Sequence, residues 1–406
     1  MFSVLNFLKK KDSSTVFVGD MWAYFNLDNP GRRYQAFVQN GHQRFSKFID
    51  SLLLYDKAII PTQDYVSLTA LVGVLGEKTV IDLLESGDIK FARLKGAFGY
   101  IGNGGGIQSF VISKDEKHGL KLQPFGDETD AVPWALEILS PKPREIKLIT
   151  KLVTKNVQTI EATTIAESIR HETYTDILNS PYLRNRFAIR NTHMDRLQGI
   201  NPNQVRMCGG PDSPNTLGDE IDIVMEICSS NLELNLAQRT GCKDLSTTFK
   251  TGHFLKGKAE RAPNLKSVSS FLRLVEVGGV PDPSSYLLKL SQGDRQKRLA
   301  QLLKLKRSGK GKKFREWFHG NHDQNPDVIV QKYIEALGKI PWISSVPAKI
   351  MRFILTGGVG LAIAGPTGAA VGMAVGAADS FFLDDWLKGF SPKIFIDDLR
   401  QVFKES

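Results

Sequence analysis

The stretch RFSKFIDSLLLYDKAIIP, residues 44–61, decides the fold class of this chain. Its first half carries apolar residues at the helical spacing i, i+3, i+4, i+7 and i+8, which predicts an amphipathic helix that begins near Arg44. These apolar positions are Phe45, Phe48, Ile49, Leu52 and Leu53. The second half, KAIIP at 57–61, predicts a buried strand that ends at a proline.

The sequence on either side of this stretch repeats the alternation. TVFVGD at 15–20 predicts a buried strand, residues 77–86 predict a helix that stops at Gly87, and residues 88–93 predict a third strand. This order of strands and helices is typical of an α/β layer with parallel pairing. AFGYI and IQSFVI then flank the glycine-rich run 102–106, which predicts a hairpin with a mobile loop.

Beyond Pro141 and Pro143 the pattern becomes helical, and a loop rich in Asn, Pro and Gly covers 193–217. Gly293 is expected to end one of the later helices. The sequence therefore predicts an α+β protein, with a small N-terminal α/β domain followed by a mainly helical remainder. The expected regions are 1–140 with the glycine-rich hairpin, 141–255 as a helical middle with the long loop, 256–345 as a helical region with a basic stretch, and 346–406 as a glycine- and alanine-rich helical hairpin with a C-terminal helix.

The composition is that of a soluble globular chain. Of 406 residues, 41% are hydrophobic and 24% are charged, which excludes a collagen, a rod and global disorder. Cys208, Cys228 and Cys242 have no metal-binding spacing and cannot form a disulfide framework, which indicates a reducing compartment. The N-terminus places its apolar residues before its lysines, the reverse of a secretory signal, so a cytoplasmic location is expected.

The positive charge is concentrated in one segment. The formal net charge is +10, and residues 295–315 carry ten basic residues and no acidic one. This basic stretch predicts binding to a polyanion, either nucleic acid or an anionic membrane surface. We expect Arg295 and Lys306 to point outward from its helix, and Gly309 and Gly311 to break that helix. The residues assigned to anion binding are Arg295, Arg298, Lys306, Arg307, Lys310, Lys312, Lys313 and Arg315.

A second unusual segment lies near the C-terminus. Residues 353–378 contain no charge, and 26 residues are enough to cross a hydrocarbon core of about 30 Å as a helix. Small residues recur every four positions and form a ridge on one helix face, a glycine zipper that favours close helix approach and self-association. The members of this ridge are Gly360, Ala364, Gly368, Gly372 and Gly376.

Three alternatives stay open for this segment: a hairpin inside a soluble core, insertion into a membrane in some state, and a flexible linker. Its seven glycines and the break at Gly365-Pro366 argue against a plain transmembrane helix. A conditional state fits the composition best, in which the segment is folded inward in solution and active on a membrane when released. Such behaviour is typical of toxin-like effectors.

The sequence gives only a weak indication of catalysis. One predicted strand ends in Asp20, and Asp64 follows the second predicted strand. Asp219, Asp222 and Glu226 open a predicted helix at i, i+3 and i+7. These carboxylates could gather around Mg²⁺ as in PIN-like ribonucleases. The alternative is that acidic residues in the first turn of a helix stabilise it through a favourable interaction with the helix dipole, which needs no metal. The weak catalytic candidates are Asp20, Asp222 and Glu226; no metal site and no cofactor is predicted.

Two other motifs resemble known functional sequences but lack residues that those functions require. GNHD at 320–323 and GDETD at 126–130 resemble two blocks of the calcineurin-like metallophosphoesterases, but the D-x-H and G-H-x-H blocks of that family are missing. SGKGKK at 308–313 lacks the first glycine and the final hydroxyl of a phosphate-binding loop.

The leading hypothesis is a non-enzymatic, membrane-associating protein or toxin-like effector that uses residues 353–378. The alternative is a cytosolic nucleic-acid-binding protein acting through 295–315, and the third is the carboxylate nuclease. The expected location is cytoplasmic, peripheral or conditionally inserted at the inner face of the membrane.

Overall fold

The structure is a computed structural model. It describes residues 14–22, 34–35, 37–38, 41–103, 106–112, 127–179, 196–197, 220–242, 244–246, 287, 289–320, 398 and 401–402.

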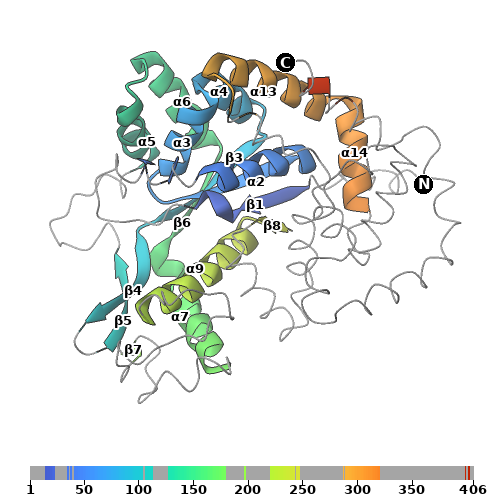
Figure 1. Ribbon diagram of the computed structural model, residues 1–406. Coiled ribbons are helices and arrows are strands. Elements are labelled where there is room, and N and C mark those ends of the chain that lie inside the picture. The colour runs from blue at the N-terminus through green and yellow to red at the C-terminus, as the bar shows by residue number, and fades with distance from the viewer. Residues whose placement is uncertain are drawn as a thin grey trace, which may run out of the picture.

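The described residues form a mixed α/β fold around a five-stranded parallel sheet of order β6-β3-β2-β1-β8 (Figure 1). Val16 of β1 pairs with Ala58 of β2. On the other side of β1, Phe17 pairs with Leu245 of β8. The strands are β1 (Thr15–Val18), β2 (Lys57–Thr62), β3 (Ile89–Lys95), β6 (Val157–Glu161) and β8 (Asp244–Ser246).

Helices cover both faces of this sheet (Figure 1). One face is covered by α2 (Gly41–Leu54), α3 (Val66–Leu75), α4 (Glu77–Glu85), α5 (Glu128–Leu136), α6 (Pro143–Lys155) and α13 (Gln292–Arg307). The other face is covered by α7 (Ala162–Asn179) and α9 (Glu220–Arg239). Burial of parallel strands on both faces explains the apolar runs 16–18 in β1 and 58–61 in β2.

Several smaller elements complete the described fold. A short helix η1 (Gly19–Met21) follows β1, η3 (Glu137–Leu139) follows α5, and α14 (Gly309–Gly320) follows α13. A separate antiparallel sheet contains β4 (Ala97–Asn103), β5 (Gly106–Ile112) and β7 (Arg196–Leu197). The predicted hairpin is confirmed, and β4 and β5 extend into the glycine-rich run, where Asn103 pairs with Gly106. The mobility of its loop stays a prediction.

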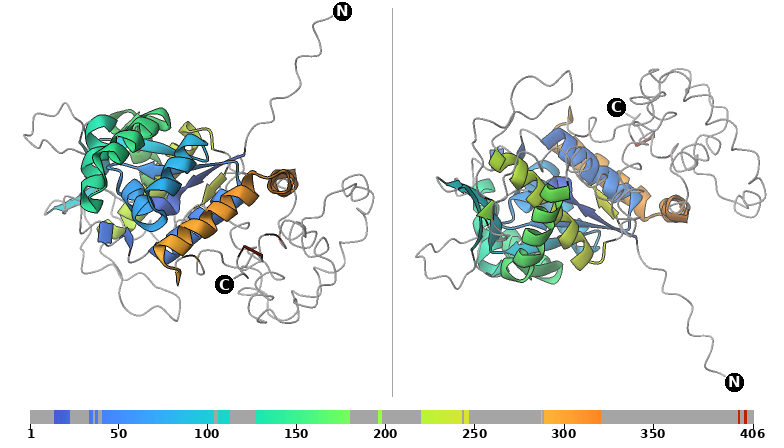
Figure 2. Two further views of the ribbon diagram at one scale, coloured as in Figure 1. Left: turned by 90° about the horizontal axis from the view of Figure 1, so that it is seen from above. Right: turned by 90° about the horizontal axis from the view of Figure 1, so that it is seen from below.

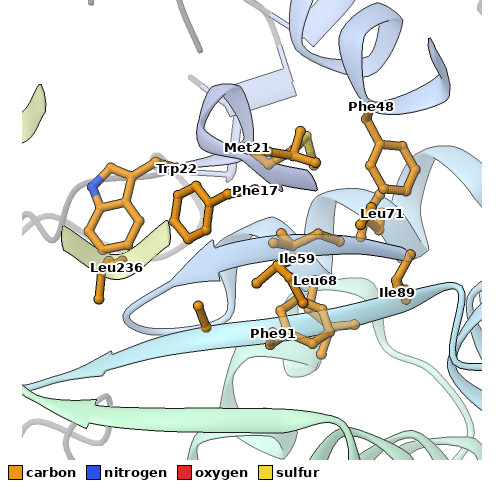
Figure 3. Packing of buried hydrophobic residues seen from close by; sticks show 14 of the residues in the cluster. Phe17, Met21, Trp22, Phe48, Ile59, Leu68, Leu71, Ile89, Phe91 and Leu236 are labelled. Carbon is orange, nitrogen blue, oxygen red and sulfur yellow. The ribbon is translucent and has the colours of Figure 1, made fainter. Parts of the chain in front are cut away.

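The core lies between the parallel sheet and its helices. Phe48, Leu71 and Leu236 bring side chains from α2, α3 and α9 to the strands, where Phe17 and Ile59 lie (Figure 3). The apolar face read from residues 45–53 is buried, which confirms the amphipathic helix. At roughly 1.5–3 kcal/mol for each large apolar side chain buried, this cluster is the main stabilising term of the fold.

Two expectations about the region beyond residue 141 are wrong. The region is not helical throughout, because β6 and β8 join the parallel sheet as an edge strand and as the neighbour of β1. Gly293 does not end a helix but lies in the first turn of α13, which Ser291 caps by accepting a hydrogen bond from the backbone of Asp294. The chain division at 140, 255 and 345 stays a prediction.

Two sequence patterns explain these differences. Residues 157–161, VQTIE, neither alternate strictly between apolar and polar residues nor form a continuous apolar run like that of β1, and most of this edge strand is exposed. β8 contains three residues, too few for a periodic signal.

Candidate functional site

The carboxyl edge of the parallel sheet is the first candidate site. In open α/β sheets ligands bind outside the carboxyl ends of the strands, where the strand order reverses direction. Here the chain proceeds from β1 through β2 and β3 to β6 and then returns to place β8 on the other side of β1. The reversal therefore lies between β1 and β8, next to Asp20.

Asp20 is a buried carboxylate held by two neighbours. Its Oδ1 lies 3.3 Å from Lys47 Nζ of α2, and its Oδ2 accepts a hydrogen bond of 3.1 Å from Ser246 Oγ at the end of β8. Burial raises the pKa of Asp20 above its ordinary value, although Lys47 and the Ser246 hydroxyl act in the opposite direction. The strand predicted at 15–20 ends earlier, at Val18, and Asp20 lies just beyond it in η1. The partners of Asp20 come from elements far apart in sequence.

A second carboxylate lies beside Asp20, and the sequence analysis did not name it. Glu233 of α9 is buried, and a Cβ at Gly19 would collide with its Oε2. The Glu233 carboxylate therefore lies against the backbone at position 19, and a larger residue there would displace it. Glu233 follows Glu226 by seven residues, so extending the i, i+7 pattern along α9 would have found it.

The other predicted carboxylates do not gather at this point. Asp64 is buried just after β2, on the same sheet edge. Glu226 is exposed on α9, about 10 Å along the helix from Glu233. The Asp222 side chain and Asp219 lie outside the described residues. Within the described part of the chain, no group of three or more His, Cys, Asp or Glu is placed to hold a metal ion.

Arg93 forms a second polar centre along the same edge. Its guanidinium is fully buried on β3, lies 2.8 Å from Glu128 Oε1 and stacks over the Tyr65 ring at 5.3 Å. Thr159 of β6 donates a hydrogen bond of 3.2 Å to the same Glu128 oxygen. Burial alone would raise the pKa of Glu128, but Arg93 and its other hydrogen bonds hold it below the ordinary value. This centre joins α5 to the sheet and gives Glu128, the middle residue of the GDETD run, a structural contact.

The basic stretch is the second candidate site, and much of its charge is used inside the molecule. The Lys306 ammonium forms an ion pair with Asp88 and donates to the backbone oxygen of Asp56 at 3.1 Å. Arg307 contacts Asp88 at 2.6 Å and Asp82 at 3.0 Å. We call Asp82, Asp88, Lys306 and Arg307 the ion-pair cluster.

The expectation that Lys306 points outward is wrong, since only 1% of this residue is exposed. Burial raises the pKa of Asp88, but Lys306 and Arg307 together hold it below its ordinary value. The cluster attaches α13 to the amino edge of the sheet, because Asp88 directly precedes β3.

Three arginines of the stretch are engaged elsewhere. Arg295 donates to the backbone oxygens of Val74, Leu287 and Leu290 at 2.9–3.0 Å. Arg298 donates to the backbone oxygen of Val402 at 3.0 Å.

Arg315 of α14 donates to Asp56 Oδ1 at 2.8 Å and to the backbone oxygen of Lys306 at 2.7 Å. These contacts satisfy carbonyl groups and one carboxylate that helix packing removes from water.

The helix breaks at Ser308 and not at the two glycines. Ser308 is extended, with φ −68° and ψ 163°, and Gly309 begins α14. Gly311 lies within α14, where a Cβ would collide with the backbone oxygens of Leu305 and Lys306. The glycine at 311 therefore permits the close approach of α14 to the end of α13.

Four lysines of the stretch remain exposed without an acidic partner among the described residues: Lys297, Lys304, Lys312 and Lys313. Lys310 is exposed but lies 2.6 Å from Asp398. Lys297 and Lys304 were not assigned to anion binding from the sequence, although their spacing of seven places them on one helix face. The anion-binding assignment stays a prediction, and these exposed lysines are its best-placed members.

The glycine ridge lies outside the described residues. In the part of the chain that the structure describes, no helix has the length and apolar character needed to cross a membrane.

Comparisons with known proteins give no family for this chain. No protein-family model matches it, and neither a curated protein nor a solved structure matches it.

Proposed function

We propose that the protein associates with anionic membranes through residues 353–378, and that the α/β fold is the water-exposed body from which this segment acts. The observation that carries the proposal is the uncharged run of 26 residues with small residues every four positions. The proposal includes the division of the chain into an N-terminal α/β domain and a mainly helical remainder, and a location at the cytoplasmic face of the membrane.

The attachment of α13 and α14 supports this proposal over nucleic-acid binding. Six of the ten basic side chains in 295–315 make contacts within the chain: Arg295, Arg298, Lys306, Arg307, Lys310 and Arg315. The stretch then serves mainly to fix the last described helices to the body. Residues 353–378, which follow α14 in the sequence, would then be connected to a helix that is fixed to the α/β fold.

The experiment is flotation of the full chain with vesicles of phosphatidylcholine and phosphatidylserine, followed by extraction with alkaline carbonate. We expect a carbonate-resistant fraction that Gly372→Leu retains, because leucine increases partitioning into hydrocarbon, while leakage of vesicle contents falls because the ridge is blocked. Ala370→Leu is the matched control, since it adds a leucine away from the ridge and is expected to keep leakage.

Two outcomes contradict the proposal. One is a chain that never floats with anionic vesicles. The other is a chain whose cooperative unfolding shifts to lower temperature with Gly372→Leu, because overpacking costs roughly 1–3 kcal/mol in a soluble core.

The exposed lysines favour nucleic-acid binding as a second candidate. Each neutralised phosphate on duplex DNA contributes a slope of about −0.9 in log K against log salt concentration. Replacement of Lys310, Lys312 and Lys313 by Gln, the α14 triple variant, should then flatten the slope by up to about three. Binding that this variant leaves unchanged would remove the candidate.

A further inference from the structure

The outer face of α6 is basic and partly apolar. The helix PREIKLITKLVTK buries Ile149 and Val153, and exposes its basic side chains. Leu148 and Ile138, the latter on η3, are each 37% exposed, among the largest values for big apolar residues in the described chain. We call Arg144, Lys147, Leu148, Lys151 and Lys155 the α6 patch; Ile138 lies five residues before the start of α6.

The lysines of the α6 patch form a single row. Lys147, Lys151 and Lys155 recur every four residues, which places them about 6 Å apart along one side of the helix. Arg144 lies four residues before Leu148, so the exposed leucine is bordered by basic side chains. Long basic side chains around an aliphatic residue are the features of a helix that lies flat on an anionic bilayer.

The acidic groups near α6 lie mainly at its ends. Glu145 accepts from the backbone of Lys142 and lies close to Glu77 at the start of the helix. Glu137 is exposed beside Ile138. At the other end, Glu85 is exposed next to Leu84, whose backbone oxygen accepts from Asn156. The two central turns, with Lys147, Leu148 and Lys151, carry no acidic residue.

Helices α6 and α13 lie in the same helix layer, which covers one face of the sheet (Figures 1 and 2). Exposed lysines on α13, Lys297 and Lys304, add positive charge to this side. The opposite side is formed by α7 and α9, and α7 reads ATTIAESIRHETYTDILN, with no excess of basic residues.

We infer that the α6 patch is a docking surface for an anionic phospholipid bilayer. This inference rests on the proposed function and deepens it, because it states how the body is oriented on the membrane. The charge complementarity and the exposed leucine select a lipid surface: the basic row meets headgroups, while Leu148 enters the boundary of the acyl chains. A nucleic acid would match the charges but would leave this aliphatic side chain without a partner.

The test is cosedimentation of the full chain with vesicles of phosphatidylserine in phosphatidylcholine and with vesicles of phosphatidylcholine alone. Replacement of Lys147, Lys151 and Lys155 by Gln, the α6 triple variant, should lower the salt-sensitive binding to anionic vesicles by about fivefold per lysine, on the order of a hundredfold in total. The α14 triple variant, which removes the same net charge, should retain most of the binding.

The apolar part of the patch has its own matched pair. Leu148→Gln should weaken binding several-fold, whereas Leu178→Gln on α7 should leave it unchanged, because Leu178 is equally exposed on the opposite side of the sheet. Unfolding temperatures of all variants are measured in parallel, and both leucine variants should unfold as the parent does.

Two outcomes overturn the inference: equal loss of vesicle binding in the two triple variants, or unchanged vesicle binding in the α6 triple variant. Failure of the proposed function looks different, since it appears as the absence of the carbonate-resistant fraction in the unmodified chain. Salt-sensitive binding that depends on α6 without this fraction would support the inference and contradict the proposed function.

Discussion

Helix α6 and the basic stretch at 295–315 look alike in sequence and use their charges in opposite ways. Both combine leucines with closely spaced lysines and arginines. In α6 the basic side chains are exposed. In α13, by contrast, Lys306 and Arg307 form ion pairs with Asp88, and Arg295 donates a hydrogen bond to a backbone oxygen of α3. Basic residues in a helix therefore do not identify a binding surface until their neighbours are known.

The difference comes from what lies beneath each helix. Lys306 faces the amino edge of the sheet, where Asp56 precedes β2 and Asp88 precedes β3. A buried lysine is tolerated only with such partners, because transfer of an unpaired charge out of water costs several kcal/mol. Helix α6 instead packs Ile149 and Val153 inward, and its lysines are exposed.

The largest expected effect comes from removing the acidic partner of Lys306. Asp88→Asn should lower the free energy of unfolding by about 3–5 kcal/mol, because it leaves the buried ammonium without a carboxylate. Urea denaturation of the full chain measures this change.

Asp82→Asn is the control, since Asp82 contacts the same Arg307 but its side chain is 50% exposed, and it should cost less than about 1 kcal/mol. Equal effects of the two substitutions would remove the distinction between the buried and the exposed ion pair.

Gly311→Ala tests the close approach of α14 to α13. The added Cβ meets two backbone oxygens that cannot move independently, so the free energy of unfolding should fall by roughly 1–3 kcal/mol. Gly309→Ala is the control, because a Cβ there has open space, and it should be neutral or stabilising by up to about 1 kcal/mol. A stabilising Gly311→Ala would contradict this packing of the two helices.

The pH dependence of the free energy of unfolding should depend on Asp88 of the ion-pair cluster and on Asp56. The folded-state pKa values of Asp56 and Asp88 lie below the ordinary value. Their contribution to stability is therefore fully present above the ordinary aspartate pKa of about 3.9, and is lost as the pH falls through the lowered folded values. Denaturant midpoints measured below about pH 4 should fall less steeply for Asp88→Asn than for the unmodified chain.

Asp20 extends the comparison to the opposite edge of the sheet. Burial raises the pKa of this carboxyl, so its ionised form is less favourable than that of Asp88. Asp20→Asn should change the free energy of unfolding at neutral pH by no more than about 1 kcal/mol. We also expect no cleavage of RNA or DNA with Mg²⁺ or Mn²⁺; metal-dependent cleavage that disappears in this variant would support the nuclease alternative.

The smallest effects belong to exposed lysines. Lys151→Gln and Lys304→Gln should each change the free energy of unfolding by less than about 0.5 kcal/mol, since no acidic residue among the described ones contacts them. Lys306→Gln, two residues from Lys304, should be clearly destabilising in the same thermal unfolding assay. A large loss of stability in Lys304→Gln would show that the difference in exposure between Lys304 and Lys306 does not determine their contributions to stability.

Much of the α/β part could be predicted because its elements have clear periods. The helix at 45–53, the strands that contain Phe17 and Ile59, and the hairpin around the glycine run follow from local patterns. β6 and β8 could not be predicted, because an exposed edge strand and a strand of three residues lack a periodic apolar signal. For the candidate sites, Asp20 could be placed near a strand end, and the spacing of seven from Glu226 points to Glu233, but only the structure shows that Glu233 lies against Gly19.

The sequence by itself determined that the chain alternates strands and helices, that its net charge is concentrated in residues 295–315, and that 353–378 carries no charge. These properties follow from residue type and spacing along one dimension. Only the tertiary structure decided that Lys306 is buried and Lys304 exposed, and that the basic row of α6 faces outward. The reason is physical: whether a charge is paired or solvated depends on which distant residues fold against it, and Asp88 meets Lys306 across 218 positions of sequence.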